Sequence, residues 1–159
     1  MRTLQAELLP QLPTSPYDRA LFLLHALHRR FPYVPGSTHV HTTAEEALAG
    51  GGGVCQDYAH IFISLLRQNS IPARYVVGML PGEGQSHAWA EANCRGYWYG
   101  LDPTNDCLAD DTYIKISHGR DYRDCIVSRG VFRGRTQQTV TVAVRVSPSQ
   151  TRQQEGLYP

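Results

Sequence analysis

The apolar residues of this chain change their spacing near residue 70, and no other feature restricts its fold as strongly. Up to Asn69 they recur at helical spacing, whereas after Pro72 they fall into short segments separated by turn-forming residues. The sequence therefore predicts an α+β fold, with N-terminal helices packed on an antiparallel β-sheet as two layers around one core. The expected helices span residues 15–31, 43–49 and 55–68, and the expected strands span residues 73–80, 86–94, 97–102, 113–117 and 139–146, with a turn at 81–85.

The size and charge of the chain limit its organisation and its partners. A length of 159 residues with 42% hydrophobic residues suits one domain, which we expect at 15–147, after an N-terminal extension at 1–14 and before a flexible tail at 148–159. The net charge of +1 gives no electrostatic footprint for nucleic acid or for a membrane surface. No segment resembles a leader or approaches the roughly 20 apolar residues of a spanning helix, so we expect a cytoplasmic protein.

The four cysteines lie far apart in the sequence and form no Cys-X-X-Cys pair. This spacing argues against a structural zinc site and against a redox motif. Because no signal peptide is recognisable, we expect free thiols rather than disulfides. The four are Cys55, Cys94, Cys107 and Cys125.

Cys55 follows the glycine run at 50–53 and begins the apolar stretch at 55–68. The unpaired amides and the positive dipole end of a helix N-terminus favour the thiolate form, which is the nucleophilic form of cysteine. Glycines before the thiol allow unusual backbone conformations and a close approach of substrate. Taken alone, this position suits a reactive thiol and a small buried packing residue equally well.

His87 and Asp102 favour the reactive thiol. A short turn at Arg95 and Gly96 predicts a hairpin that pairs Cys94 with Tyr97. In that register, His87 and Asp102 are diagonal neighbours on one sheet face, with roughly 7–8 Å between their backbones. We expect the helix that carries Cys55 to pack across this same face, so that one imidazole nitrogen meets the thiol and Asp102 binds the other.

Three blocks of sequence in this order resemble the bacterial transglutaminase-like superfamily. They are Gly53-Val54-Cys55-Gln56-Asp57-Tyr58-Ala59-His60, His87-Ala88-Trp89-Ala90-Glu91 and Asp102-Pro103-Thr104-Asn105. The resemblance implies a papain-like fold, a catalytic triad of Cys55, His87 and Asp102, and acyl transfer through a thioester without a cofactor. It also implies a peptide or protein substrate that carries an amide or a glutamine side chain, and an amine or water as the acyl acceptor.

Hydrolysis by a cysteine peptidase or amidase is the expected reaction, because it needs no second binding site. A protein-glutamine transglutaminase or deamidase is the alternative, and a non-catalytic interaction module that keeps the fold is an alternative of another class. Gln56 and Trp89 flank the expected site, and Tyr33 lies in the loop upstream of it. We predict these three residues as substrate contacts, and for Trp89 a core aromatic or a cleft wall is favoured over a catalytic group.

Two polar clusters offer metal binding as a rival interpretation. His39 and His41 form a His-X-His pair near Glu45 and Glu46, but no third ligand is placed by the sequence, so loop histidines before a capped helix are favoured. The second cluster comprises Asp106, Asp110 and Asp111. It lacks the alternating ligands and the glycine of an EF-hand calcium loop, so a solvated acidic loop is favoured. We therefore expect no metal.

Overall fold

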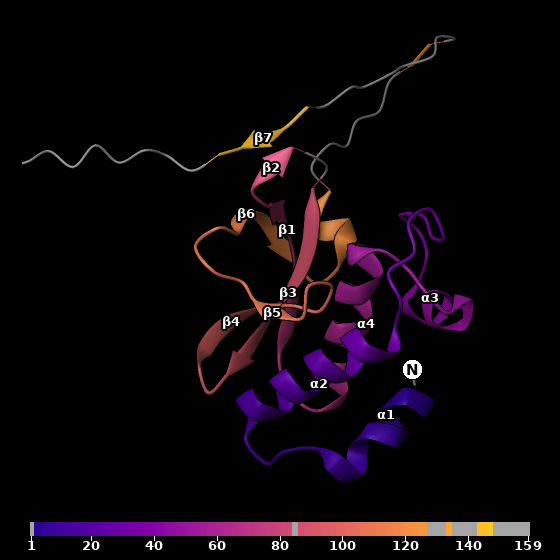
Figure 1. Cartoon of the computed structure of the whole chain (residues 1–159), viewed down its shortest axis with the longest axis vertical. Helices are drawn as coiled ribbons and strands as arrows, with labels where there is room; N and C mark the ends of the chain where they lie inside the picture. Colours follow the sequence, from indigo (N-terminus) through magenta and orange to yellow (C-terminus); the bar gives the residue numbers. More distant parts are fainter. Residues whose placement is uncertain (1, 84–85, 127–132, 135–142, 148–159) are drawn as a thin grey trace, which may run out of the picture.

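The computed structural model describes residues 2–83, 86–126, 133–134 and 143–147. Helices precede the strands of a five-stranded sheet, so the fold is α+β as predicted (Figure 1). The helices are α1 (Arg2–Leu8), α2 (Pro16–Arg30), α3 (Ala44–Gly50) and α4 (Cys55–Gln68), with 3-10 turns η1 (Leu9–Gln11) and η2 (Tyr122–Cys125). The strands are β1 (Ala73–Met79), β2 (Gly82–Glu83), β3 (His87–Cys94), β4 (Tyr97–Asp102), β5 (Cys107–Leu108), β6 (Ile114–Gly119) and β7 (Arg145–Val146).

The helices α2, α3 and α4 lie close to their predicted bounds, because each has a clear sequence signal at its start. Pro16 occupies the first turn of α2, where its missing N–H has no cost. The predicted capping box at α3 is present: Thr43 Oγ1 accepts the Glu46 N–H at 3.2 Å, and the Glu46 carboxylate accepts the Thr43 N–H at 2.8 Å. Helix α4 begins at Cys55, as predicted.

Helix α1 was not predicted from the sequence. Its seven residues are too few to form a stable isolated helix, so its order depends on tertiary contacts. Leu8 is fully buried in the main core, and the side-chain amides of Gln5 and Asn69 form two reciprocal hydrogen bonds of 3.1 and 3.0 Å. These contacts fasten the N-terminus to the end of α4.

The sheet has the strand order β5-β4-β3-β1-β6, with every pair antiparallel. The predicted hairpin register is confirmed, because Cys94 pairs with Tyr97 and Ala90 pairs with Leu101. Arg95 has a φ of 56° and Gly96 a φ of 93°, as in the two-residue turns that match strand twist. In the strand order of the sheet, β3 is the central strand, with β4 on one side and β1 on the other.

The two faces of the sheet carry different residues of β3. Helix α4 packs against the face that carries Ala88 and Ala90, and α2 and α3 pack on α4 (Figure 1). His87 and Trp89 alternate with these alanines and belong to the opposite face. The expectation that α4 covers the face of His87 is therefore wrong. Cys55 is the first residue of α4 and His87 the first residue of β3, so the two meet at the end of the sheet.

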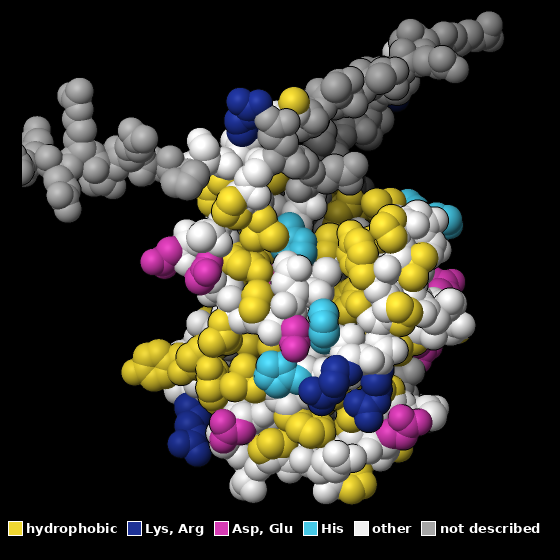
Figure 2. Space-filling view, viewed as in Figure 1, with side chains coloured by type: hydrophobic (Ala, Val, Ile, Leu, Met, Phe, Trp, Pro, Cys, Tyr) yellow, Lys and Arg dark blue, Asp and Glu magenta, His cyan; other side chains and the backbone are white. Residues whose placement is uncertain are grey.

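Strand pairing outside the main sheet is limited to short segments. Gly82 and Glu83, inside the segment predicted as a turn, pair with Val146 and Arg145. Of the strand predicted at 139–146, residues 139–142 lie outside the described residues, as does the tail predicted at 148–159. Apolar side chains also gather over the β4 side of the sheet, where Tyr97 is 72% exposed (Figure 2). Within the described ranges, no helix is long and apolar enough to cross a membrane.

Candidate active site

Cys55 owes its position to the way in which α4 begins. The buried Asp57 carboxylate accepts the Val54 N–H at 2.8 Å and the Thr38 hydroxyl at 2.6 Å, which joins the helix start to the loop before α3. A Cβ on Gly53 would lie 2.5 Å from this carboxylate, so only glycine fits there. Gly53 therefore gives room to the capping carboxylate, whereas we had predicted that the glycines before Cys55 leave room for substrate.

Tyr33 is brought to the site by pairing with the same glycine. The backbone N–H of Val34 donates to Gly53 O at 2.9 Å, and the Gly53 N–H donates to Pro32 O at 3.2 Å. These bonds hold Tyr33 next to the start of α4, where its side chain is 53% exposed and lines the same cleft as Cys55 and His87. Its predicted role as a substrate contact stays a prediction.

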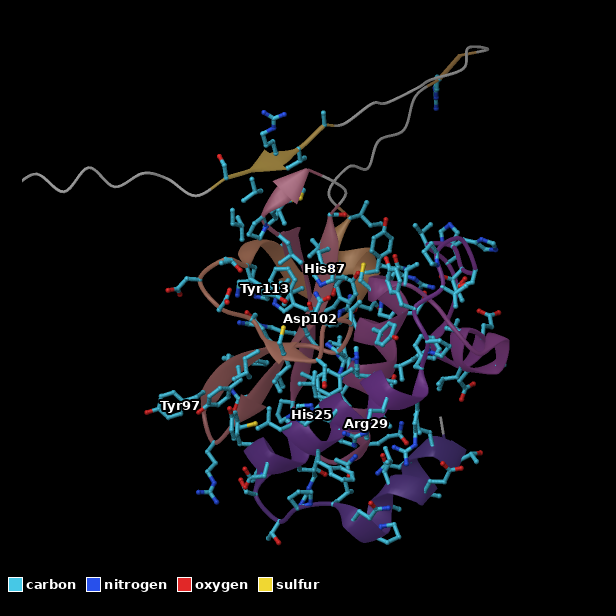
Figure 3. All side chains as sticks on the ribbon, in the orientation of Figure 1. His25, Arg29, His87, Tyr97, Asp102 and Tyr113 are labelled. Atoms are coloured by element: carbon cyan, nitrogen blue, oxygen red, sulfur yellow. The ribbon has the colours of Figure 1, made fainter. Side chains whose placement is uncertain are left out.

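His87 and Asp102 interact directly, as the hairpin register predicts (Figure 3). The Nε2–H of His87 donates to Asp102 Oδ2 at 2.7 Å, and Asp102 is fully buried. Burial by itself lowers the pKa of His87, but hydrogen bonds with Asp102 and Cys55 outweigh it and raise this pKa to about 9. The ring is therefore an imidazolium at neutral pH, with Nδ1 left for Cys55.

Asp102 has more support than the sequence predicted. Its Oδ2 also accepts the Asn105 Nδ2–H at 2.7 Å and the Tyr113 hydroxyl at 2.9 Å. Its Oδ1 accepts the backbone N–H groups of Thr104 at 2.9 Å and Asn105 at 3.3 Å. Burial alone raises the pKa of Asp102, but the bonds from His87, Tyr113 and Asn105 outweigh it and hold this pKa below its ordinary value. The carboxylate therefore stays ionised although it is buried.

Asn105 and Tyr113 are residues that sequence reasoning missed as parts of the site. Asn105 had a usable signal, because an aspartate followed by turn residues often accepts hydrogen bonds from the next backbone amides. Tyr113 had no local signal, since it comes from the loop after β5 and reaches Asp102 only in the folded chain (Figure 3). Its hydroxyl also lies 3.2 Å from Cys107 Sγ.

Trp89 is a buried aromatic, which is one of the roles weighed for it from the sequence, and this burial does not favour its predicted contact with substrate. It is 2% exposed and fills a slot between two neighbouring strands, because a Cβ on Gly78 would lie 2.4 Å from its ring. The His87 ring stacks on Trp89 at 6.2 Å between centroids, and Tyr113 meets Trp89 edge-on at 5.3 Å. Trp89 thus supports the imidazole from behind and leaves no surface for a substrate.

Two clefts meet at the Cys55 and His87 pair, and both are also lined by Val54 and Ser86. The larger, of about 620 Å³, is further lined by Tyr33, Pro35, Gly36, Met79, Leu80, Pro81, Gly82 and Val144. The smaller, of about 270 Å³, is further lined by Thr38, His39, Val40, Gln56, Tyr75, Val77, Ala88 and Tyr122. The Gln56 Nε2 donates to Val40 O at 3.1 Å, which fixes its side chain in the wall of the smaller cleft.

Three of the residues considered as metal ligands have other partners. Glu46 is engaged in the α3 capping box, and Asp110 accepts hydrogen bonds from Thr112 at 2.9 and 2.5 Å. Asp106 pairs with His25 of α2, with 2.6 Å between Oδ1 and Nδ1. In the part of the chain that the structure describes, no group of three potential ligand side chains is close enough to hold a metal ion.

Known proteins share this fold and much of this sequence. The family model described as the transglutaminase-like superfamily matches residues 6–103. An uncharacterized protein of Mycobacterium leprae is 39% identical over 128 residues, which cover 74% of this chain and 46% of that protein, so the chain spans about half the length of this relative.

Solved structures support the same relationship. A "putative cysteine protease" from Cytophaga hutchinsonii has a TM-score of 0.71 and 31% identity, over 79% of this chain and 43% of its own. Legionella pneumophila LapG has a TM-score of 0.58 over 74% of this chain and 70% of its own, and with 15% identity it supports the fold alone. The chain therefore belongs to the transglutaminase-like superfamily.

Proposed function

We propose that this chain is a thiol-dependent acyl-transfer enzyme that acts on amide or peptide bonds through a thioester at Cys55. One observation carries the proposal. Cys55 and His87 line the same cleft, while a buried and ionised Asp102 holds the other side of the imidazole. A helix-terminal thiol beside a fixed imidazolium is the arrangement that activates cysteine as a nucleophile.

In the proposed mechanism the Cys55 thiolate attacks the carbonyl carbon of the scissile amide, and the resulting oxyanion accepts the backbone N–H of Cys55. His87 gives its Nδ1 proton to the leaving amine as the C–N bond breaks and the thioester forms. His87 then takes a proton from the incoming water, which attacks the thioester and releases the acid and the thiolate. Asp102 keeps the imidazole in its orientation and tautomer throughout.

Hydrolysis is the favoured outcome, because water needs no binding site of its own. The substrate of this reaction is a peptide or protein with a reactive backbone amide or glutamine side chain. Transfer to a primary amine, as in a transglutaminase, uses the same thioester and stays the alternative, together with deamidation. The chemistry needs no cofactor, and we retain a cytoplasmic location as part of the proposal.

The deciding measurement is the product that the purified chain forms from a glutamine peptide, with and without a primary amine. Ammonia release alone supports deamidation, amine incorporation supports transfer, and backbone cleavage supports peptidase action. Cys55→Ala is the control and must abolish each activity while the fold is retained. Absence of a thioester with every tested substrate would favour the non-catalytic interaction module.

Thiol labelling tests the nucleophile without a substrate. Cys55 should react with iodoacetamide at mildly acidic pH faster than the other cysteines. Cys94 and Cys125 are buried and therefore slow for a trivial reason, so the informative comparison is with the half-buried Cys107. Equal rates for Cys55 and Cys107 would contradict the proposed thiolate.

A further inference from the structure

A second pocket, of about 310 Å³, borders the smaller cleft at Cys55 and shares Val40 and Tyr122 with it. Its walls come from the loop before α3 and the start of α3, from one side of α4, and from η2 with the residues before it. The side chains that carry the charge and the hydrogen-bond donors of these walls are His60, Arg67, Arg120, Asp121 and Arg123. None of these side chains takes part in the proposed thioester chemistry.

Positive charge dominates this pocket, which contains three arginines and a single aspartate. Arg120 is neutralised by Asp124, with 2.8 Å between Nε and Oδ2. Arg67 and Arg123 form no ion pair among the residues that the structure describes. Two positive charges therefore face the pocket without a carboxylate partner, against the one charge of Asp121.

The free donors of Arg67 match a carboxylate. Its Nη2 donates to the backbone oxygens of Ala73 at 2.9 Å and Arg120 at 2.8 Å, which fixes the guanidinium plane. The Nε and Nη1 hydrogens have no acceptor among the described residues. A guanidinium held in this way keeps Nε–H and Nη1–H as donors in fixed directions. Each can donate one charge-assisted hydrogen bond to a carboxylate, while both bidentate edges include the occupied Nη2.

His60 adds a neutral donor. Its Nε2 accepts the backbone N–H of Tyr122 at 3.2 Å, so the ring proton of the neutral imidazole lies on Nδ1. Burial lowers the pKa of His60, although Asp121 and Asp57 act in the opposite direction. The ring is therefore a neutral hydrogen-bond donor at physiological pH.

Helix α4 sets the distance between this pocket and the thiol. His60 follows Cys55 by five residues, or about 8 Å along the helix axis, and Arg67 follows it by twelve residues, or about 18 Å. An extended peptide advances about 3.3 Å per residue, so this interval corresponds to roughly two to five residues. A single peptide can thus reach Cys55 and this pocket together.

We propose that this pocket binds a carboxylate of the peptide substrate, two to five residues from the reacting amide, through Arg67, Arg123 and His60. The inference rests on the proposed function, because it assigns a substrate to the same cleft. The carboxylate comes from an acidic side chain or from the C-terminus of the peptide. The chain therefore prefers acidic peptides to neutral ones.

Binding to the full chain with Cys55→Ala tests the pocket independently of turnover. The probes are fluorescent glutamine peptides with a blocked C-terminus and one Glu two to five residues from the glutamine on either side, compared with the same peptides carrying Gln. Peptides with a free C-terminal carboxylate and no Glu show whether the pocket binds the C-terminus of a peptide instead of an acidic side chain. We expect the best acidic peptide to bind about three- to tenfold more tightly than its neutral partner, with the difference shrinking in 0.5 M salt.

Arg123→Gln should remove most of this preference, and it should not disturb the fold because the side chain is exposed and has no described partner. The matched control is Arg29→Gln, an exposed arginine on α2 far from His87 (Figure 3), which should keep the preference. Equal binding of acidic and neutral peptides, including no binding of either, overturns the proposal, as does an equal effect of the two substitutions. An inactive chain that still prefers acidic peptides would refute the enzyme and keep the pocket.

Discussion

The face of the sheet that α4 covers and the face that carries His87 are packed in different ways. On the first, Ala88, Ala90 and Ala92 are small residues of the main hydrophobic core against which α4 packs. On the second, a ring of hydrogen bonds surrounds a buried carboxylate, with Trp89 as its apolar support. The difference teaches that the first face contributes through apolar packing, whereas on the second face the proposed chemistry and part of the stability depend on the same charged groups.

The largest expected effect is that of Asp102→Asn on the second face. The substitution removes the charge that holds the His87 imidazolium, so turnover of a glutamine peptide should fall by about 10²–10⁴-fold. The pKa of His87, about 9 in the parent chain, should fall towards 6.5, which a titration followed by NMR would show. If this pKa were unchanged, Asp102 would not be the group that tunes it.

The same pair makes stability depend on pH. The pKa of His87 rises from 6.5 in the unfolded chain to about 9 in the folded chain, so protonation stabilises the fold. This contribution is fully present below pH 6.5, decreases between pH 6.5 and 9, and is absent above pH 9. It amounts to at most roughly 3 kcal/mol.

Urea unfolding at pH 6 and pH 9 measures this contribution. The free energy of unfolding should decrease from pH 6 to pH 9 in the parent chain. This decrease should be smaller in a His87→Gln chain, which keeps the other titratable groups. A decrease of the same size in both chains would assign it to other groups.

The first face should respond to volume instead of charge. Ala90 is fully buried against α4, so Ala90→Leu inserts three carbons into a filled space and should cost about 1–3 kcal/mol of unfolding free energy. Thermal unfolding checks this cost. The activity of the fraction that stays folded should match the parent chain, and a loss of kcat at full folding would show that the two faces are coupled.

Much of this arrangement was predictable because it depends on short-range signals. The start of α4 at Cys55 follows from the glycine run and the apolar spacing, and the turn at Arg95 and Gly96 sets the register that brings His87 to Asp102. These two signals bring together the residues of the proposed triad. They do not define which sheet face α4 covers, since strand alternation distinguishes two faces but does not say which one a helix will cover.

The surroundings of the triad depend on tertiary contacts, and the sequence did not predict them. Tyr113 is eleven residues from Asp102 in the chain, and only the path of the intervening loop brings its hydroxyl to the carboxylate. A core aromatic and a cleft wall were both open for Trp89 from the sequence, and the absence of a side chain at Gly78 on the neighbouring strand gives its ring the buried slot. Helix α1 likewise depends on the burial of Leu8 in the main core.

The smallest expected effect comes from removing one hydroxyl on each face. Tyr113→Phe keeps the ring against Trp89 but removes one hydrogen bond to Asp102, at a cost of about 0.5–1.5 kcal/mol. The pKa of Asp102 should rise, because that bond helps to lower it, so activity should be lost at a higher pH on acidification. The stability that the ionised Asp102 contributes above its ordinary pKa should also be lost earlier as the pH falls.

Tyr99→Phe is the matched control, because Tyr99 lies on β4 on the helix-covered face, against Tyr17, and its hydroxyl has no described partner. The change should alter stability by less than about 0.5 kcal/mol and leave the pH profile in place. Unfolding curves and pH–rate profiles of both chains make the comparison. If the two substitutions shifted the acid limb of the pH–rate profile equally, the Tyr113 hydroxyl would not act through Asp102. Removal of a hydroxyl would then have the same effect on both faces of the sheet.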